Sequence, residues 1–399
     1  MAKQQVVHPK IRGFICTNSH PIGCAKNVEM QAIYARQAIS SRQTGLNALV
    51  IGASTGYGLA SRIALATGYG ANTIGVFFEK PPVGKKTGTA GYYNSFAFHK
   101  YAERHGVKAL SINGDAFSDK VKAETIDSIK RELGQLDLIV YSLASPRRIH
   151  PRTGEDYRSV LKPIGKPYSD KTIDLVKEEV VNISVETATQ KEISDTIAVM
   201  GGEDLTFWVD CLLENDCLKP GAQAVAYSYI GPEITHQIYT SGTIGQAKDD
   251  LQNHVDKIDK KLEQVIGGNA FVSVNKAVIT QASAAIPVIP LYISILYKIM
   301  DSKGINENPI AQITRLLTEH LFSDHGPKLD GQRRIRLDER ELSAEVTDQV
   351  KKVWSQITTE NLHHLADYNR YKTGFRNLFG FDVDNVNYDQ EVETDLFLP

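Results

Sequence analysis

The sequence predicts an α/β fold built on a doubly wound parallel sheet with helices on both faces. Two features carry this prediction. From residue 46 onward, short apolar runs typical of strands alternate with segments in which apolar residues recur every three or four positions. The first of these runs, at 47–51, opens directly into the glycine-rich turn GASTGYG at 52–58 and then into a helical pattern. Alternating strands and helices of this kind form Rossmann-type parallel sheets.

Six strands are expected in the sheet. Several are near-continuous apolar runs, as strands covered on both faces are, and we place the six at 47–51, 73–78, 107–113, 136–143, 222–228 and 270–274. The clearest helix between them carries apolar side chains spaced 4, 3, 4 and 3 residues apart, at Leu251, Val255, Ile258, Leu262 and Val265.

We expect one large domain, 1–399, with three additions to the minimal nucleotide-binding core. Residues 1–45 form an N-terminal helical extension, and the core spans 46–300. A long polar insertion at 145–205 is expected to have a small structure of its own. Residues 301–399 are mainly helical, with one face marked by Val346, Val350, Val353 and Ile357.

Composition excludes several classes of protein. With 45 basic and 47 acidic residues, the chain has no electrostatic footprint for nucleic acid. Four scattered cysteines are too few for a disulfide scaffold, and no signal peptide is visible, so we expect a cytoplasmic protein. The fragment with Cys16, His20 and Cys24 lacks a nearby fourth ligand, so no metal is expected.

The segment 277–297 has no charged residue and imitates a membrane span. Pro287 and Pro290 would interrupt a continuous helix there. We therefore expect no transmembrane span, and interpret the segment as a buried wall of the substrate site.

The glycine turn predicts a dinucleotide site. Its G-x-x-x-G-x-G spacing is similar to that of short-chain dehydrogenases, in which backbone amides and the positive end of the next helix hold the pyrophosphate. Glu79, at the end of the second strand, is positioned to accept from the ribose 2′-hydroxyl and to repel a 2′-phosphate, which favours NADH over NADPH. The alternative is a solvated loop glutamate beside Lys80. Asp115, after the third strand, could accept from the adenine amino group.

A competing motif overlaps the same turn. Residues 52–56 match G-x-S-x-G, the nucleophile elbow of α/β-hydrolases, with Ser54 as the nucleophile. The motif lies on the first core strand, and no HGGG-type oxyanion segment precedes it. Both facts count against a hydrolase.

Tyr239 and Lys248 supply the phenol and ammonium needed to handle a proton beside a nicotinamide. Nine residues on one helix are two and a half turns, so the two side chains would point apart. They can converge only if the chain is non-helical between them, and 241–243 is a suitable break, with a helix starting near Thr243. Tyr227 or Tyr229 could be the acid instead. A protein that senses NAD without chemistry is a further alternative.

Several blocks of sequence together resemble one family. GASTGYG at 52–58, YSLASPRR at 141–148, AYSYIG at 226–231 and VNKAVIT at 274–280 are similar to the FabV-type enoyl-ACP reductases and their relatives, the trans-2-enoyl-CoA reductases. The resemblance runs from about residue 11 to the C-terminus and includes GTAGYYN at 88–94 and VMGGED at 199–204.

The resemblance implies roles for individual residues. Tyr239 would be catalytic, Lys248 would hold the cofactor ribose, and Tyr229 would touch the substrate. Many members have a second lysine where this chain has Asp249. The implied contacts to NADH are Gly52, Ala53, Ser54, Thr55, Gly56, Tyr57, Phe78, Glu79, Asp115, Ala116, Leu143, Ala144, Lys248, Val278, Ile279 and Thr280.

The resemblance also implies the reaction. NADH would reduce the trans-2 double bond of an enoyl thioester on acyl carrier protein, the final reductive step of fatty acid elongation. Enoyl-CoA substrates such as crotonyl-CoA would be accepted as well, and a dedicated trans-2-enoyl-CoA reductase is the alternative. The apolar stretch 286–296 would receive the acyl chain, and the enzyme would be a monomer.

Overall fold

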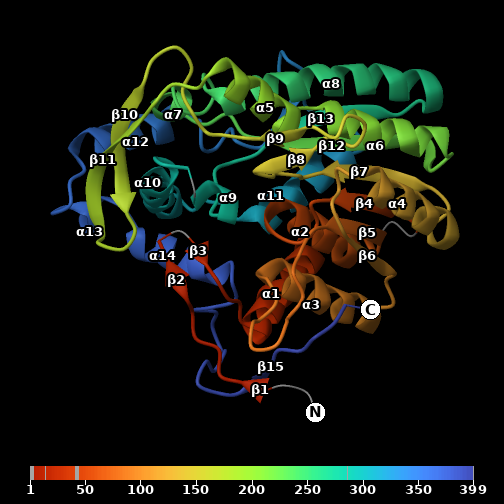
Figure 1. The fold of residues 1–399 in the computed structure, drawn as a ribbon, viewed down its shortest axis with the longest axis horizontal. Coiled ribbons are helices and arrows are strands. Elements are labelled where there is room, and N and C mark those ends of the chain that lie inside the picture. The colour runs from red at the N-terminus through yellow and green to blue at the C-terminus, as the bar shows by residue number, and fades with distance from the viewer. Residues whose placement is uncertain (1–3, 14, 41–44, 285, 399) are drawn as a thin grey trace.

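A computed structural model describes residues 4–13, 15–40, 45–284 and 286–398 (Figure 1). Residues 1–3, 14 and 41–44 of the predicted N-terminal extension lie outside this set, as does residue 285 of the uncharged segment. The rest of the extension holds the predicted helix, α1 (Pro21–Ala38), together with short strands.

Seven parallel strands form the central sheet, in the order β14-β13-β12-β7-β4-β5-β6. β4, the first of these seven strands along the chain, lies inside the sheet, with β5 and β6 on one side and the later strands on the other. The predicted doubly wound parallel sheet is therefore confirmed. The strands are β4 (Asn47–Ile51), β5 (Asn72–Phe77), β6 (Ala109–Asn113), β7 (Leu136–Tyr141), β12 (Leu218–Ser228), β13 (Asn269–Val274) and β14 (Arg334–Arg336).

All six predicted strands are present, and the seventh was not predicted. β14 is only three residues long and has the sequence Arg-Ile-Arg, so it lacks the apolar run that marks the others. Only Ile335 of this strand is buried. β14 lies at the sheet edge, within the region expected to be mainly helical.

Helices cover both faces of the sheet, and β4 shows why. Ala48 and Val50 pack with the helices of one face, whereas Leu49 and Ile51 pack with those of the other. This alternation follows from the two-residue period of a strand. In Figure 1, α1 and α3 lie on the side of the sheet opposite to α6 and α8. One face carries α1, α2 (Gly56–Ile63), η1 (Ala64–Tyr69, a π-helical turn), α3 (Ala90–Arg104) and α11 (Pro309–Leu316); the other carries α4 (Asp119–Glu132), α6 (Glu203–Glu214) and α8 (Thr243–Ile266).

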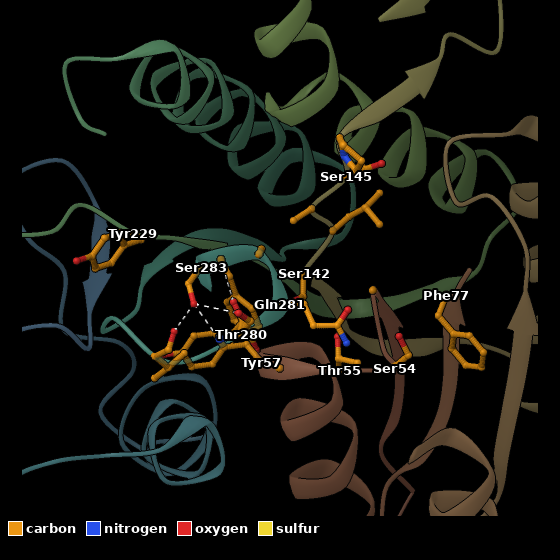
Figure 2. Close-up of a pocket in the computed structure, with 18 of the residues that line it drawn as sticks. Ser54, Thr55, Tyr57, Phe77, Ser142, Ser145, Tyr229, Thr280, Gln281 and Ser283 are labelled. Atoms are coloured by element: carbon orange, nitrogen blue, oxygen red, sulfur yellow. Dashed lines mark hydrogen bonds between the residues drawn. The ribbon is translucent and has the colours of Figure 1, made fainter. Parts of the chain in front are cut away.

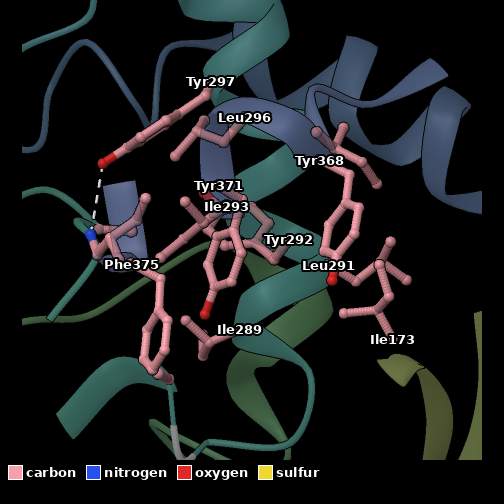
Figure 3. Close-up of a cluster of buried hydrophobic side chains, with 14 of the residues drawn as sticks. Ile173, Ile289, Leu291, Tyr292, Ile293, Leu296, Tyr297, Tyr368, Tyr371 and Phe375 are labelled. Atoms are coloured by element: carbon pink, nitrogen blue, oxygen red, sulfur yellow. Dashed lines mark hydrogen bonds between the residues drawn. The ribbon is translucent and has the colours of Figure 1, made fainter. Parts of the chain in front are cut away.

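A third hydrophobic cluster lies beside the sheet and surrounds α10 (Ile289–Ser302), as Figure 3 shows. The predicted face at 346–357 packs there from α12 (Ala344–Gln356): Val346, Val350 and Ile357 are buried, and Val353 packs against them. Residues of α14 (Tyr368–Asn377) close the cluster.

Residues 145–205, the expected insertion, lie between the sheet strands β7 and β12. They hold two antiparallel hairpins and a helix: β8 (Arg147–Ile149) with β9 (Asp156–Arg158), β10 (Tyr168–Asp174) with β11 (Glu179–Val185), and α5 (Gln190–Met200). The remaining elements are β1 (Gln4–Gln5), β2 (Ile11–Arg12), β3 (Ile15–Cys16), α7 (Glu233–His236), α9 (Gln281–Ala284), η2 (Leu317–Leu321), α13 (Leu362–Leu365) and β15 (Val392–Glu393).

The uncharged segment is not one helix. It runs through a stretch without regular secondary structure, the short α9 and then α10, which has Pro290 in its first turn. Among the described residues, no helix combines the length and apolar character that crossing a membrane requires. Nor do three or more potential ligands of the His, Cys, Asp and Glu types gather there as a metal site would need. His20 instead caps α1, accepting from the Gly23 N–H at 3.2 Å.

Candidate active site

One cavity of about 850 Å³ opens at the carboxyl ends of the central strands. Ligands of open α/β sheets bind at this edge, beside the point where the strand order reverses. In Figure 2, Ser54 and Thr55 lie at one end of the cavity and Tyr229 at the other. The volume lies within the range of pockets that hold small molecules and cofactors.

The glycine turn forms the cavity floor at its phosphate-binding end. Gly52 has φ of +85°, and a Cβ added there would lie 2.2 Å from the carbonyl oxygen of Ser142. Only glycine lets β4 and the end of β7 approach this closely. Thr55 caps α2 in an extended conformation, so the free amides of its first turn face the cavity that Thr55, Gly56 and Tyr57 line. These residues fit a pyrophosphate.

Glu79 is held by two hydroxyl groups. Ser54 Oγ donates to Glu79 Oε1 at 2.7 Å, and Thr89 Oγ1 donates to Oε2 in a short hydrogen bond. Glu79 also lines the cavity, next to Phe78, whose side chain is 81% exposed at the rim. Glu79 is therefore an ordered part of the site, contrary to the alternative of a solvated loop glutamate.

The contact of Ser54 with Glu79 also bears on the hydrolase alternative. A nucleophilic serine needs a base, in most cases a histidine, within hydrogen-bond reach. No histidine is among the described residues that line this cavity. The geometry therefore argues against Ser54 as a nucleophile.

The third and fourth strands deliver their predicted residues to the same cavity. Asp115, Ala116, Leu143 and Ala144 all line it. The Asp115 carboxylate also accepts from the Phe117 N–H at 3.0 Å, which fixes its orientation after β6.

Two predicted cofactor contacts do not line the cavity. Ala53 is fully buried against the sheet, where its N–H donates to the Val76 carbonyl. Ile279 lies between Val278 and Thr280, both of which line the cavity. Ile279 points the other way, toward Gly374 of α14. Side chains of these two residues are not positioned to contact a ligand in the cavity.

The chain between Tyr239 and Lys248 is not one continuous helix, which leaves both side chains able to line the same cavity. Tyr239 lies in the turn after α7, and α8 begins at Thr243 and carries Lys248 on its second turn. Both line the cavity. Burial raises the pKa of Tyr239 above its usual range, and burial lowers the pKa of Lys248 to about 8. The Lys248 ammonium donates to the Tyr227 carbonyl at 3.3 Å.

The two neighbouring tyrosines have their hydroxyl groups engaged elsewhere. Tyr227 shares a hydrogen bond of 2.6 Å with Ser61. Tyr229 donates to Glu341 Oε1 at 3.0 Å, and Figure 2 shows its hydroxyl directed away from the other labelled residues. The ring of Tyr229 packs edge-on to that of Tyr239, with centroids 5.0 Å apart. Tyr239 is thus the best placed of the three phenols to act as an acid.

Sequence reasoning missed Glu341, which lies behind the cavity wall. Its side chain is 0% exposed, and it accepts from Tyr229, from Tyr292 and from the Ala277 N–H. Burial raises its pKa, while the nearby Lys276 opposes that rise. Glu341 follows the unpredicted β14 and belongs to no recognisable motif, so the sequence carried no signal for it.

The far end of the cavity is apolar. Ile286, Ile289 and Ile293 line it, one from the start of the segment and two from successive turns of α10. The other apolar residues of α10, including Leu291 and Leu296, point into the hydrophobic cluster instead (Figure 3). Only one face of the predicted acyl-binding stretch therefore lines the cavity. Asp249 is exposed on α8 and is not among the lining residues.

Comparisons with known proteins agree on one family. The NAD(P)H binding domain of trans-2-enoyl-CoA reductase matches residues 6–84, and the trans-2-enoyl-CoA reductase catalytic region matches residues 86–322. The enoyl-[acyl-carrier-protein] reductase [NADH] of Coxiella burnetii (strain CbuG_Q212) is 50% identical over 99% of this chain and 97% of its own length. That of Pseudoalteromonas atlantica is 52% identical over 98% of each chain. The solved structure of Treponema denticola trans-2-enoyl-CoA reductase in complex with NAD has a TM-score of 0.95 and 45% identity, covering 99% of this chain and 100% of that one.

A third family model, described as an enoyl reductase FAD binding domain, matches residues 329–392. None of the described residues of that segment lines the cavity. Its arginines near β14 are paired with acids, Arg334 with Asp330 and Arg336 with Asp338. The described residues of the segment do not fit a flavin, and we derive no step through one.

Proposed function

The chain belongs to the trans-2-enoyl-CoA reductase family, and on that premise we propose that it reduces the trans-2 double bond of enoyl thioesters with NADH. The proposal rests on one observation. The glycine turn, Glu79, Tyr239 and Lys248 all line a single cavity whose far end is apolar. A dinucleotide bound with its pyrophosphate at the glycine turn and its nicotinamide near Tyr239 would place the nicotinamide beside the apolar end of the cavity, where we expect the acyl chain.

Tyr239 and Lys248 have different parts in the proposed reaction. When bound, NADH supplies a hydride to the β-carbon, which leaves negative charge on the thioester oxygen. We assign Tyr239 as the donor to that oxygen, because its buried phenol holds its proton until charge develops. Lys248 is assigned to the nicotinamide ribose, and its positive charge also favours a developing tyrosinate. A proton taken up from water at the α-carbon completes the reduction.

We propose acyl carrier protein as the carrier of the physiological substrate, at the final reductive step of fatty acid elongation. The naming of the Coxiella and Pseudoalteromonas relatives supports this choice. Coenzyme A presents the same phosphopantetheine arm, and the Treponema relative supports the second candidate, a dedicated trans-2-enoyl-CoA reductase. Ile286, Ile289 and Ile293 would receive the acyl chain in either case.

Steady-state kinetics test the function and the carrier together. Oxidation of NADH is followed with enoyl-CoA and enoyl-ACP of the same chain length. We expect turnover with both and a larger kcat/KM with the ACP substrate; a larger value with CoA favours the second candidate. Binding of NADH without turnover would indicate a sensor, and thioester hydrolysis without NADH that Ser54→Ala abolishes would indicate a hydrolase.

We further propose that the enzyme acts as a cytoplasmic monomer. All four cysteines are free thiols, which suits a reducing compartment. Light scattering coupled to gel filtration tests the oligomeric state; a mass of about one chain supports the proposal, and a mass of two or more chains contradicts it.

A further inference from the structure

The carboxylate of Glu79 is fixed at both of its oxygens. Ser54 donates to one and Thr89 to the other. A carboxylate offers about four lone-pair positions, so two remain for hydroxyl groups of a ribose. Ser54 is buried and Thr89 is half-buried, which limits how far water can replace either donor.

Thr89 lies at a position where a side-chain hydroxyl ordinarily caps the helix that follows. It is the N-cap residue of α3, and an N-cap threonine normally accepts from an amide of the first turn. Here it makes no such side-chain bond. Its oxygen accepts from the Lys80 N–H at 3.2 Å, and its proton goes to Glu79. The hydroxyl therefore ties the loop after β5 to the Glu79 carboxylate.

The Glu79 carboxylate also has no space to move toward α3. A Cβ added at Gly91 would lie 2.0 Å from Glu79 Oε1 and 2.8 Å from Ser54 Cβ. The first turn of α3 is thus packed directly against the carboxylate. On its remaining side Glu79 borders the cavity.

From these contacts we propose that Thr89 and Ser54 are positioning residues that set the preference for NADH over NADPH. They act by holding the Glu79 carboxylate against the ribose side of the cavity. This inference rests on the proposed use of NADH. The inference assigns to Ser54 and Thr89 the function of fixing the position of the Glu79 carboxylate.

The physical reason is the difference between a fixed and a mobile charge. A 2′-phosphate carries close to two negative charges at neutral pH and would meet the carboxylate at short range. A free glutamate can rotate to another side-chain conformer and relieve that repulsion at small cost. A glutamate held at both oxygens must first lose two hydrogen bonds to charged acceptors, which are among the stronger ones in proteins. The ammonium group of Lys80, which is exposed, would attract the 2′-phosphate if the Glu79 carboxylate moved away.

Direct binding of both cofactors tests the proposal without relying on catalysis. The dissociation constants for NADH and NADPH are measured by fluorescence titration in Thr89→Val, Thr89→Ser and Ser54→Ala. Valine keeps the shape of threonine and removes the hydroxyl, whereas serine keeps the hydroxyl. We expect the ratio Kd(NADPH)/Kd(NADH) to fall about fivefold to tenfold in Thr89→Val and in Ser54→Ala, and to stay within about twofold in Thr89→Ser.

A second comparison asks whether Thr89 acts through Glu79. In a Glu79→Ala background there is no carboxylate to hold, so adding Thr89→Val should leave the ratio unchanged. Equal falls in the presence and absence of Glu79 would overturn the proposal. So would an unchanged ratio in both Thr89→Val and Ser54→Ala, with the two cofactors weakened together, as a purely structural role predicts. A fall in Thr89→Ser as large as that in Thr89→Val would also overturn it.

These outcomes are separable from those of the proposed function. A protein that reduces no enoyl thioester but shows the expected change in binding ratio contradicts the function and supports the inference. A protein that reduces enoyl thioesters with no change in ratio does the reverse. If Thr89→Val does not fold, Ser54→Ala decides, because it removes one oxygen atom and adds nothing.

Discussion

At the scale of single residues, the site depends on which hydroxyl groups are free. Tyr227 and Tyr229 also lie near Lys248 in the sequence. The hydroxyl groups of both, however, have hydrogen-bond partners outside the cavity. Tyr239 has a raised pKa from burial alone. Residue type and spacing along the sequence do not identify the proton donor among the three tyrosines. The hydrogen-bond partners of their hydroxyl groups do.

Replacing Tyr239 should therefore cost far more than replacing its neighbour. Tyr239→Phe keeps the ring against Tyr229 and removes the donor to the thioester oxygen. We expect kcat to fall about 10²- to 10³-fold with little change in NADH affinity, because the phenol meets the substrate and not the dinucleotide. Tyr229→Phe is the matched control and should lose less. Near-normal turnover in Tyr239→Phe with collapse in Tyr229→Phe would show that the tyrosines are wrongly assigned.

Lys248 predicts a decline of activity at alkaline pH. Burial lowers its pKa from 10.5 to about 8, so the free enzyme loses this ammonium as the pH rises through 8. The charged form holds the ribose, and kcat/KM for NADH reports the free enzyme. The value should be flat below pH 8 and fall above it. In Lys248→Arg, whose charge persists, the fall near pH 8 should vanish; a profile identical to that of the unmodified protein would assign it to another group, such as Lys276.

At the scale of elements, the turn between α7 and α8 carries Tyr239 and leads into the helix that carries Lys248. The N–H groups of Gly242 and Gly245 both donate to the Tyr239 carbonyl. A Cβ added at Gly245 would lie 1.8 Å from the carbonyl oxygen of Thr240. The first turn of α8 can therefore pass the loop only if residue 245 has no side chain.

Gly245→Ala should displace this turn and lower kcat more than tenfold, since misplacing a catalytic group by about 1 Å can cost 10²-fold. Gly331→Ala is the control, because a Cβ there meets nothing within 4 Å and the position lies outside the cavity. Turnover and thermal melting are measured for both. A loss of melting temperature without a loss of kcat in Gly245→Ala would contradict the role assigned to the turn.

The elements that were predictable are those with a strong local pattern. β4 was predicted to the residue, and the start of α8 at Thr243 followed from the requirement that Tyr239 and Lys248 converge. β14 and Glu341 were not predictable. Strand β14 is held by pairing with β13, and Glu341 by donors 49 to 112 residues away in the sequence. Contacts of that range leave no local signature.

At the scale of the whole molecule, we propose that the chain unfolds as one cooperative unit. Its first described strand, β1, pairs with its last, β15. Sheet strand β14 and the buried Glu341 come from the C-terminal region but complete the core and the site. These contacts join the N-terminal, central and C-terminal parts of the described chain and support the proposal.

The two tryptophans allow this to be measured. Trp208 is buried beneath the sheet on α6, and Trp354 lies on α12 in the separate cluster around α10. Single-tryptophan variants, Trp208→Phe and Trp354→Phe, each report on one region. After correction for the stability change each causes, their fluorescence transitions should coincide with the loss of helical circular dichroism. Separate transitions would divide the chain into at least two domains.

The pairing of β1 with β15 has a consequence for the protein during its synthesis. Residues 5 and 392 are partners although 387 positions separate them. At about 5–20 residues per second, a ribosome needs roughly 20–80 s to make the chain between them. Throughout that time the N-terminal strand β1 has no partner in the nascent chain. Once β13 has been made, it is an open edge of the sheet until β14, which ends at residue 336, is available to pair with it. Unpaired strand edges recruit other chains. We therefore expect the chain to be prone to association with other chains until its C-terminal strands have been made.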